Sequence, residues 1–308
     1  MSQEVNIRKR LFMLLGLFVL AFLACNPFSS LPDDAALNEA GTQVAMGLTQ
    51  TAQAMPTVTS PTQVSPTATE IALPIISESV VAALQVDFFY DQTIFSQVER
   101  VFEEGYAPEG VDESIYSPDH LFFALTYADE SVDGDFYGIL VWPADEYASM
   151  NPYAAQTLSE LEDLLQRRPA LELNADYPVL PAPMAAMWMS TQVEYLTFQN
   201  GSGIRYVVQR VQQAAPISNQ SLRYRFLGLT EDGKYYVSAT FMAAHPLLPA
   251  NPEQYLAENG TDWNTFVVED QSQYRVETAE LLAGQSPDSF DPSLLVLDEM
   301  MQSLKVGD

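Results

Sequence analysis

The chain has 308 residues, of which 13 are Lys or Arg and 41 are Asp or Glu, so its formal net charge is −28. A negative field of this size repels phosphate groups, which argues against nucleic acids and anionic lipid headgroups as partners. The single cysteine excludes an intramolecular disulfide and a metal site built from several cysteines.

The first 24 residues have the layout of a secretory signal peptide. A basic segment, Arg8 to Arg10, precedes an apolar run from Leu11 to Ala24. As a helix, about 14 residues extend roughly 21 Å, which is short of the roughly 30 Å hydrocarbon core of a bilayer. A cleaved signal peptide is therefore favoured, and an uncleaved anchor helix is the alternative.

The apolar run ends on Phe22-Leu23-Ala24-Cys25. This stretch resembles the lipobox of bacterial lipoproteins, although Phe22 and Leu23 depart from its usual residues. The resemblance implies that the chain is cut before Cys25, that Cys25 carries the lipid, and that the protein is held on the extracytoplasmic side of the cell membrane. The alternative is a plain signal peptide with an incidental cysteine.

A disordered linker is predicted over residues 25–75. Its stretch GTQVAMGLTQTAQAMPTVTSPTQVSPTATE is rich in Thr and Pro and contains no Lys or Arg. Such a composition buries too little apolar surface to offset the entropy of ordering the chain, and Thr/Pro tracts form extended stalks. We expect a stalk that holds the following domain away from the membrane, with a short helix over residues 35–50 as the one ordered element.

Residues 76–308 are long enough for one domain with a sizeable core. Four runs rich in Val, Tyr and Phe follow one another between Thr191 and Met242, and the breaks between them carry Gly, Pro or Asn. Breaks this short join antiparallel neighbours, so the pattern predicts a four-strand meander. Two further strands are expected at residues 120–128 and 136–142.

Three helices are predicted around these strands. Residues 151–169 carry the strongest signals, with Asn151 as the cap, Pro152 in the first turn and leucines at helical spacing. Residues 291–304 begin with a similar Asp-Pro pair, and residues 91–105 are the third candidate. A mainly antiparallel sheet flanked by separate helices is an α+β fold.

This layout loosely resembles the α/β/α sandwiches of the PsbP and Mog1 type. The stretches FQNGSGIRY and DGKYYVSA also resemble uncharacterised surface lipoproteins. The resemblance implies helices layered on a sheet, and it implies no particular activity.

Five basic residues lie on the predicted meander, and they could form a binding site for an anion. Cleavage before Cys25 removes three of the 13 basic and one of the 41 acidic residues, which leaves 10 against 40 and a charge of −30. Arg223 and Arg225 share one face of their strand, and together with Arg205 they are the candidates for a guanidinium cluster that binds carboxylate or phosphate. The alternative, which we favour, is that these arginines pair with the protein's own acids. The five basic residues are Arg205, Arg210, Arg223, Arg225 and Lys234.

Signals for catalysis are sparse. The chain has two histidines, His120 and His245, and it lacks the GxSxG, HExxH and Walker motifs. A Ser–His–Asp arrangement assembles from distant positions, so it stays open. The many carboxylates single out no pair of the kind a glycosidase uses.

Residues 129–140 resemble the start of a calcium loop. The twelfth position, however, is Leu140, where such a loop has a bidentate Glu. The preferred interpretation is an acidic hairpin turn, because Asp-Gly between apolar runs is a strong hairpin signal. The calcium alternative would use Asp129, Ser131, Asp133 and Asp135.

The sequence thus favours a non-enzymatic ligand- or protein-binding domain on a lipid-anchored stalk, without a cofactor. The rival hypothesis is an extracytoplasmic hydrolase that uses His245 or a carboxylate pair. The partner is either a protein or a small molecule, and its identity is not encoded in any motif.

Overall fold

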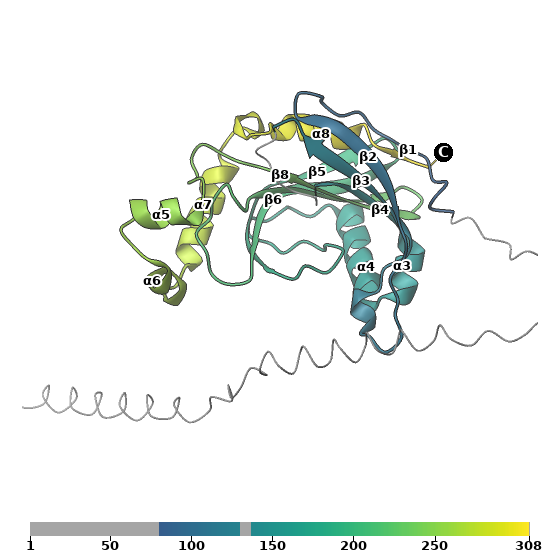
Figure 1. Ribbon diagram of the computed structural model, residues 1–308, viewed down its shortest axis with the longest axis horizontal. Coiled ribbons are helices and arrows are strands. Elements are labelled where there is room, and N and C mark those ends of the chain that lie inside the picture. Colours follow the sequence, from purple (N-terminus) through teal and green to yellow (C-terminus); the bar gives the residue numbers. More distant parts are fainter. Residues whose placement is uncertain (1–79, 130–136, 308) are drawn as a thin grey trace, which may run out of the picture. The chain divides into compact units, whose positions relative to one another are not determined.

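The computed structural model describes residues 80–129 and 137–307 (Figure 1). Cys25, the linker of residues 25–75 and the calcium-loop positions Ser131, Asp133 and Asp135 lie outside the described residues.

Seven antiparallel strands form one sheet, in the order β2-β3-β4-β8-β7-β6-β5. The strands β5 to β8 are consecutive neighbours, which confirms the predicted meander, and β3 and β4 confirm the two further strands. The bounds are β2 Phe95–Glu103, β3 His120–Tyr127, β4 Gly138–Pro143, β5 Ala186–Phe198, β6 Gly201–Val211, β7 Arg223–Thr230 and β8 Tyr235–Met242.

The helices belong to two groups. The first lies between β4 and β5 and comprises α3 (Ala144–Met150) and α4 (Pro152–Arg167). The second follows β8 and comprises α5 (Pro252–Glu258), α6 (Trp263–Val268), α7 (Ser272–Ala283) and α8 (Leu294–Gln302). A two-stranded pairing of β1 (Val86–Asp87) with β9 (Lys305–Val306) and two short 3₁₀ turns, Glu113–Ile115 and Pro287–Ser289, complete the described elements. The architecture is α+β, as predicted.

Helices α3 and α4 lie on one face of the sheet, and α8 with part of α7 lies on the opposite face (Figure 1). Side chains alternate along each strand, so each strand contributes to both faces. One face packs against α8 and part of α7, and we call it the α8 face; its core includes Val207, Tyr224, Phe226, Val237 and Phe241. The other face packs against α3 and α4, and we call it the α4 face; its core includes Trp142, Ile204, Tyr206, Leu227 and Tyr236.

Helix α4 forms as the sequence predicts. The Asn151 side chain accepts a hydrogen bond from the Ala154 N–H at 3.0 Å, and Pro152 occupies the first turn. The helix ends where Arg168 adopts a left-handed conformation with φ of 45°, just before Pro169. The apolar stripe faces the sheet and buries Leu158, Leu161 and Leu165.

The predicted helix at residues 91–105 is wrong, because this segment forms the edge strand β2. Its apolar residues Phe95, Val98 and Val101 recur every third position, which imitates one side of a helix. In the structure a bulge between Phe95 and Gln97 shifts the register of β2 against β3, which keeps Phe95 and Val98 on one face, whereas Val101 lies on the other face, opposite Phe122. The second correction concerns the C-terminal helix, which begins at Leu294 and not at the Asp-Pro pair.

Among residues 80–129 and 137–307, no helix combines the length and apolar character needed to cross a bilayer.

Candidate functional site

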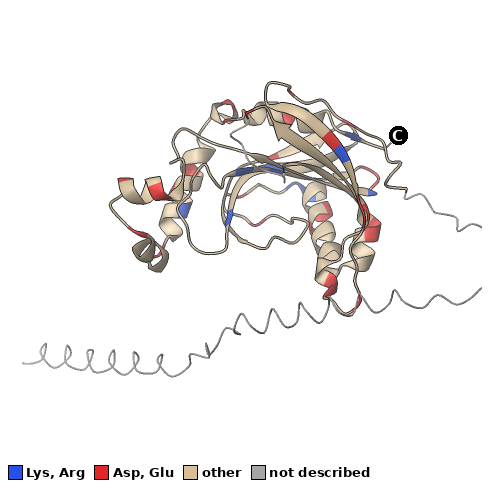
Figure 2. Cartoon of the chain, viewed as in Figure 1, with Lys and Arg blue, Asp and Glu red and all other residues tan. Residues whose placement is uncertain are grey.

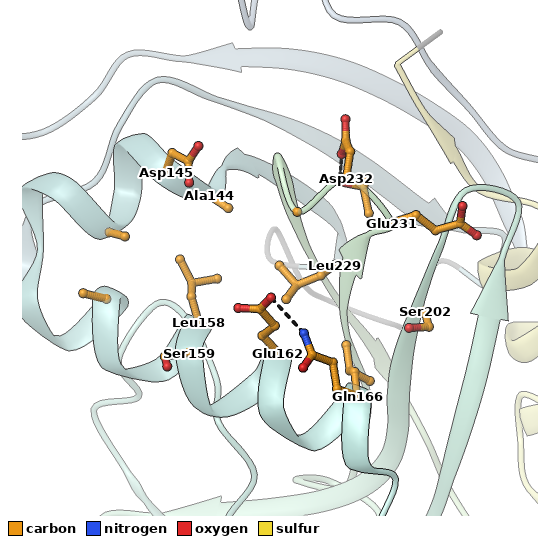
Figure 3. Close-up of a pocket in the computed structure, with 15 residues that line it drawn as sticks. Ala144, Asp145, Leu158, Ser159, Glu162, Gln166, Ser202, Leu229, Glu231 and Asp232 are labelled. Atoms are coloured by element: carbon orange, nitrogen blue, oxygen red, sulfur yellow. Dashed lines mark hydrogen bonds between the residues drawn. The ribbon is translucent and has the colours of Figure 1, made fainter.

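A cavity of about 560 Å³ lies between α3, α4 and the turn that joins β7 to β8 (Figure 3). This volume falls within the roughly 300–1,000 Å³ of small-molecule sites. Its lining comes from residues 144–166, from Ser202 of β6 and from residues 229–233, because α3 and α4 cross the α4 face beside the end of β7.

The floor of the cavity is apolar. Leu158 of α4 and Leu229 of β7 approach each other across it, and Leu165 extends it along α4. The remaining apolar lining consists of small side chains, which leave the space that larger residues would fill: Ala144, Ala148 and Ala155.

The rim of the cavity is acidic. Figure 2 shows acidic residues on α3 and α4, and the β7–β8 turn adds two more carboxylates (Figure 3). No Lys, Arg or His lies among the described residues that line the cavity. The lining carboxylates are Asp145, Glu162, Glu231 and Asp232.

Two of these carboxylates already have partners within the chain. Glu162 accepts a hydrogen bond from the Gln166 amide at 3.0 Å. Asp232 lies 2.8 Å from the Lys234 ammonium and accepts from the Thr230 hydroxyl at 2.7 Å. The hydrogen bond from Lys234, followed by that from Thr230, lowers the pKa of the Asp232 carboxyl to about 2. Asp232 is therefore a fixed negative charge at neutral pH.

The carboxylates of Asp145 and Glu231 differ from those of Glu162 and Asp232. No residue that the structure describes forms a hydrogen bond or an ion pair with either of them. Both side chains are exposed at the rim. Within the described ranges, no three His, Cys, Asp or Glu side chains converge as metal ligands would. The rim therefore offers dispersed negative charge around an apolar floor, which suits an organic cation better than a bare metal ion.

The arginines of the predicted cluster do not lie together. Arg205 is the cross-strand partner of Phe226, which places it on the α8 face, whereas Arg225 is the partner of Tyr206 on the α4 face. Arg223, two residues before Arg225, shares its face. The structure thus separates Arg205 from the other two candidates.

Arg205 is fully buried in an ion-pair network. Its guanidinium lies 2.8 Å from Asp298 of α8 and 2.7 Å from Glu194 of β5, and it also donates to the Gln192 carbonyl. The Tyr224 hydroxyl donates to the same Asp298 carboxylate at 2.9 Å. For Arg205, pairing with the protein's own acids is confirmed, and its role is to join α8 to the sheet.

His245 contacts a serine, but in the wrong tautomer for catalysis. The Leu247 N–H donates to Nδ1 at 3.2 Å, so the ring proton is on Nε2, which donates to the Ser289 hydroxyl at 3.0 Å. Ser289 in turn donates to the Ser286 carbonyl at 2.6 Å. A catalytic triad needs the reverse arrangement, with Nε2 accepting from serine and Nδ1 donating to an acid. Burial also lowers the pKa of His245.

His120 has a structural environment. It stacks on Trp142 with ring centroids 5.1 Å apart, and Nδ1 contacts the Pro118 carbonyl at 3.0 Å. Nε2 lies 3.1 Å from Glu103, its cross-strand partner on β2. No serine hydroxyl is recorded against either ring nitrogen among the described residues.

Comparison with protein-family models, with curated proteins and with solved structures returned no match. Any function must therefore be argued from the geometry of this chain.

Sequence reasoning missed the cavity. Its carboxylates come from α3, α4 and a turn, and nothing in their spacing along the chain predicts that they meet. The only local signal is the consecutive pair Glu231 and Asp232, and this pair is typical of an ordinary polar hairpin turn.

Proposed function

We propose that this chain is a lipid-anchored extracytoplasmic binding protein whose α+β domain takes a cationic group with an apolar body. The single observation that carries this proposal is the cavity, in which an acidic rim surrounds a floor of leucines and alanines. The anchor rests on the signal-like segment and on Cys25 in the sequence.

The apolar floor of the cavity favours a hydrocarbon body, and its acidic rim favours a cationic group on the same ligand. The apolar floor gains free energy when it covers hydrocarbon, at about 25 cal/mol per Å² of buried apolar surface. The carboxylates of Asp145 and Glu231 are free to accept hydrogen bonds from an ammonium or guanidinium group. A primary amine on an alkyl chain, or a Lys or Arg side chain of a partner protein, has both parts.

The charge of the whole chain supports the same ligand class. A formal charge of −28 attracts cations and raises their concentration near the surface, and this effect weakens as salt is added. Binding of a cation is therefore expected to weaken with ionic strength, whereas binding of a neutral ligand is not.

The test compares three probes that share one apolar body: hexylammonium, hexanol and hexanoate. Calorimetric titration of the full chain is expected to rank hexylammonium first. The double variant Asp145→Asn, Glu231→Gln is expected to weaken hexylammonium binding about tenfold, because it removes the two negative charges of the rim that have no partner among the described residues. Glu253→Gln on α5 removes an acid outside the cavity and is expected to have no effect. Equal affinity for the three probes, or equal loss in the control, would refute the proposal.

The hydrolase alternative has one observation in its favour, the 3.0 Å contact between Ser289 and His245. The tautomer that the Leu247 N–H imposes opposes it. Ester turnover by the full chain that disappears in His245→Ala would support this alternative against the binding proposal.

A further inference from the structure

Part of the α4 face is left open by α3 and α4. Trp142 and Tyr236 are buried on this face, but further along β4, β7 and β8 several side chains are only half-buried. We call this part the open strip. It consists of Phe122, Leu140, Arg225 and Thr240.

Arg225 lies in the open strip with most of its hydrogen-bonding capacity unused. Its Nη1 donates to the Thr240 hydroxyl on β8, and no carboxylate in the part of the chain that the structure describes lies within ion-pair distance. The two arginines on the neighbouring strand β6 are both paired with carboxylates: Arg205 with Asp298, and Arg210 with Asp176 at 2.6 Å. A half-buried guanidinium that has five N–H donors and one neutral acceptor is incompletely satisfied.

A second unsatisfied group lies beside Arg225. Tyr206, its cross-strand partner, is 1 % exposed, and its hydroxyl has no hydrogen-bond partner among the described residues. Arg225 and Tyr206 both lie near the buried hydroxyl of Tyr236. Burial is the main cause that raises the pKa of Tyr236; the charge of Arg225 opposes this rise, and Tyr206 adds to it. A buried hydroxyl without a partner is costly and rare in folded proteins.

We propose that the open strip binds an oxyanion, a carboxylate or a phosphate group, between the Arg225 guanidinium and the Tyr206 hydroxyl. Each of these groups can donate a hydrogen bond, and an oxyanion accepts from both at once. Arg223 is not part of this site, because its guanidinium lies over the ring of Tyr137, a residue of the α8-face core, and donates to two backbone carbonyls.

The open strip also offers an apolar surface for the body of such a ligand. The Phe122 ring lies over Gly138, where a Cβ atom would come within 2.6 Å of it, and Gly138 is the register partner of Thr240. The strip is separate from the acidic cavity, because Arg225 and Leu229 are four residues apart on β7, or about 13 Å in a strand. The acidic surface repels polyanions at long range, so a small, singly or doubly charged ligand fits best.

The test uses the full chain in a nonionic detergent, with inorganic phosphate and hexanoate as probes and chloride at matched ionic strength as the reference. At least one probe is expected to raise the Tm above the chloride value and to give a saturable calorimetric isotherm. Arg225→Gln is expected to weaken that binding about tenfold or more, since a charge-assisted contact is lost. Arg168→Gln removes an exposed arginine at the end of α4 and is expected to leave binding unchanged.

Tyr206→Phe separates a binding role from a structural role. Because the hydroxyl has no partner among the described residues, its removal is expected to leave the Tm without anion unchanged or higher, and to weaken anion binding several-fold. Phosphate binding without hexanoate binding would identify a phosphate ligand, and the reverse a carboxylate; either result supports the proposal. Saturation by neither probe, or equal binding by wild type and Arg225→Gln, would overturn it. A lower Tm for Tyr206→Phe with unchanged anion affinity would overturn the role of the hydroxyl.

Discussion

Replacing Asp298 by Ala tests the contact that joins α8 to the sheet. Asp298 accepts hydrogen bonds from Arg205 Nε at 3.0 and 3.2 Å, from Arg205 Nη2 at 2.8 Å and from the Tyr224 hydroxyl at 2.9 Å. Asp298 is 4 % exposed and Arg205 is 1 % exposed, so these contacts are shielded from solvent. The guanidinium keeps Glu194, whose side chain is 59 % exposed, and the Gln192 carbonyl.

The magnitude follows from the charge that is left behind. Removing one partner of a buried ion pair costs about 3–5 kcal/mol, mostly because the remaining charge is buried without full compensation. For a domain of this size about 1 kcal/mol corresponds to roughly 2–4 °C, so the Tm is expected to fall by about 10 °C. The matched control is Asp163→Ala, which breaks a 2.6 Å pair with Arg167 on the surface of α4. That pair is exposed, and its loss is expected to cost about 0.5 kcal/mol or less.

Urea unfolding followed by near-ultraviolet circular dichroism measures both free energies. A double variant, Arg205→Met with Asp298→Leu, replaces the pair by apolar side chains and is expected to recover much of the loss, since no charge then remains buried. The reasoning would be refuted if Asp298→Ala cost no more than Asp163→Ala. It would also be refuted if the double variant were less stable than the single one.

Three further predictions concern the cap of α4 and two titrating groups. Asn151→Ala is expected to lower the free energy of unfolding by about 1–3 kcal/mol in urea melts, because the cap to Ala154 and two amide hydrogen bonds to backbone carbonyls are lost. The Asp232 carboxyl is expected to titrate by NMR near pH 2, and since its pKa is lowered on folding, its contribution to stability is present above about pH 4 and is lost as the pH falls toward 2. His245 is expected to titrate below about pH 6.5; the unfolded chain takes up this proton first, so stability decreases as the pH falls below that value, and His245→Gln is expected to reduce the decrease.

The strands of the meander could be predicted because their signals are local. Each run is dense in β-branched and aromatic residues, and each break contains turn residues. Strand β2 could not be recognised, because apolar residues at every third position favour a helix and only the pairing with β3 decides otherwise. Helix α7 gave no amphipathic signal either, since Val276 and Leu281 on it are exposed.

The candidate sites could not be predicted from single segments, because they depend on how strands pair and how helices pack. Parity along one strand placed Arg223 and Arg225 on a common face, but the face of Arg205 depends on the register of β6 against β7. The cavity needed the packing of α3 and α4 beside the β7–β8 turn, which no local pattern contains. Local chemistry therefore predicted the elements, and long-range packing decided which side chains meet.

The two faces of the sheet differ in how their arginines are paired. On the α8 face, the buried Arg205 guanidinium contacts two carboxylates and a backbone carbonyl, so its charge is paired within the chain. On the α4 face, the Tyr206 hydroxyl and the Trp142 Nε1 are buried without partners in the described structure, and Arg225 is incompletely satisfied. Unsatisfied polar groups cost free energy and contribute nothing to folding. Trp188 Nε1, packed against the α8-face core, is also buried without a partner among the described residues, so what distinguishes the α4 face is an incompletely satisfied guanidinium beside a buried hydroxyl. Binding experiments should begin with that pair.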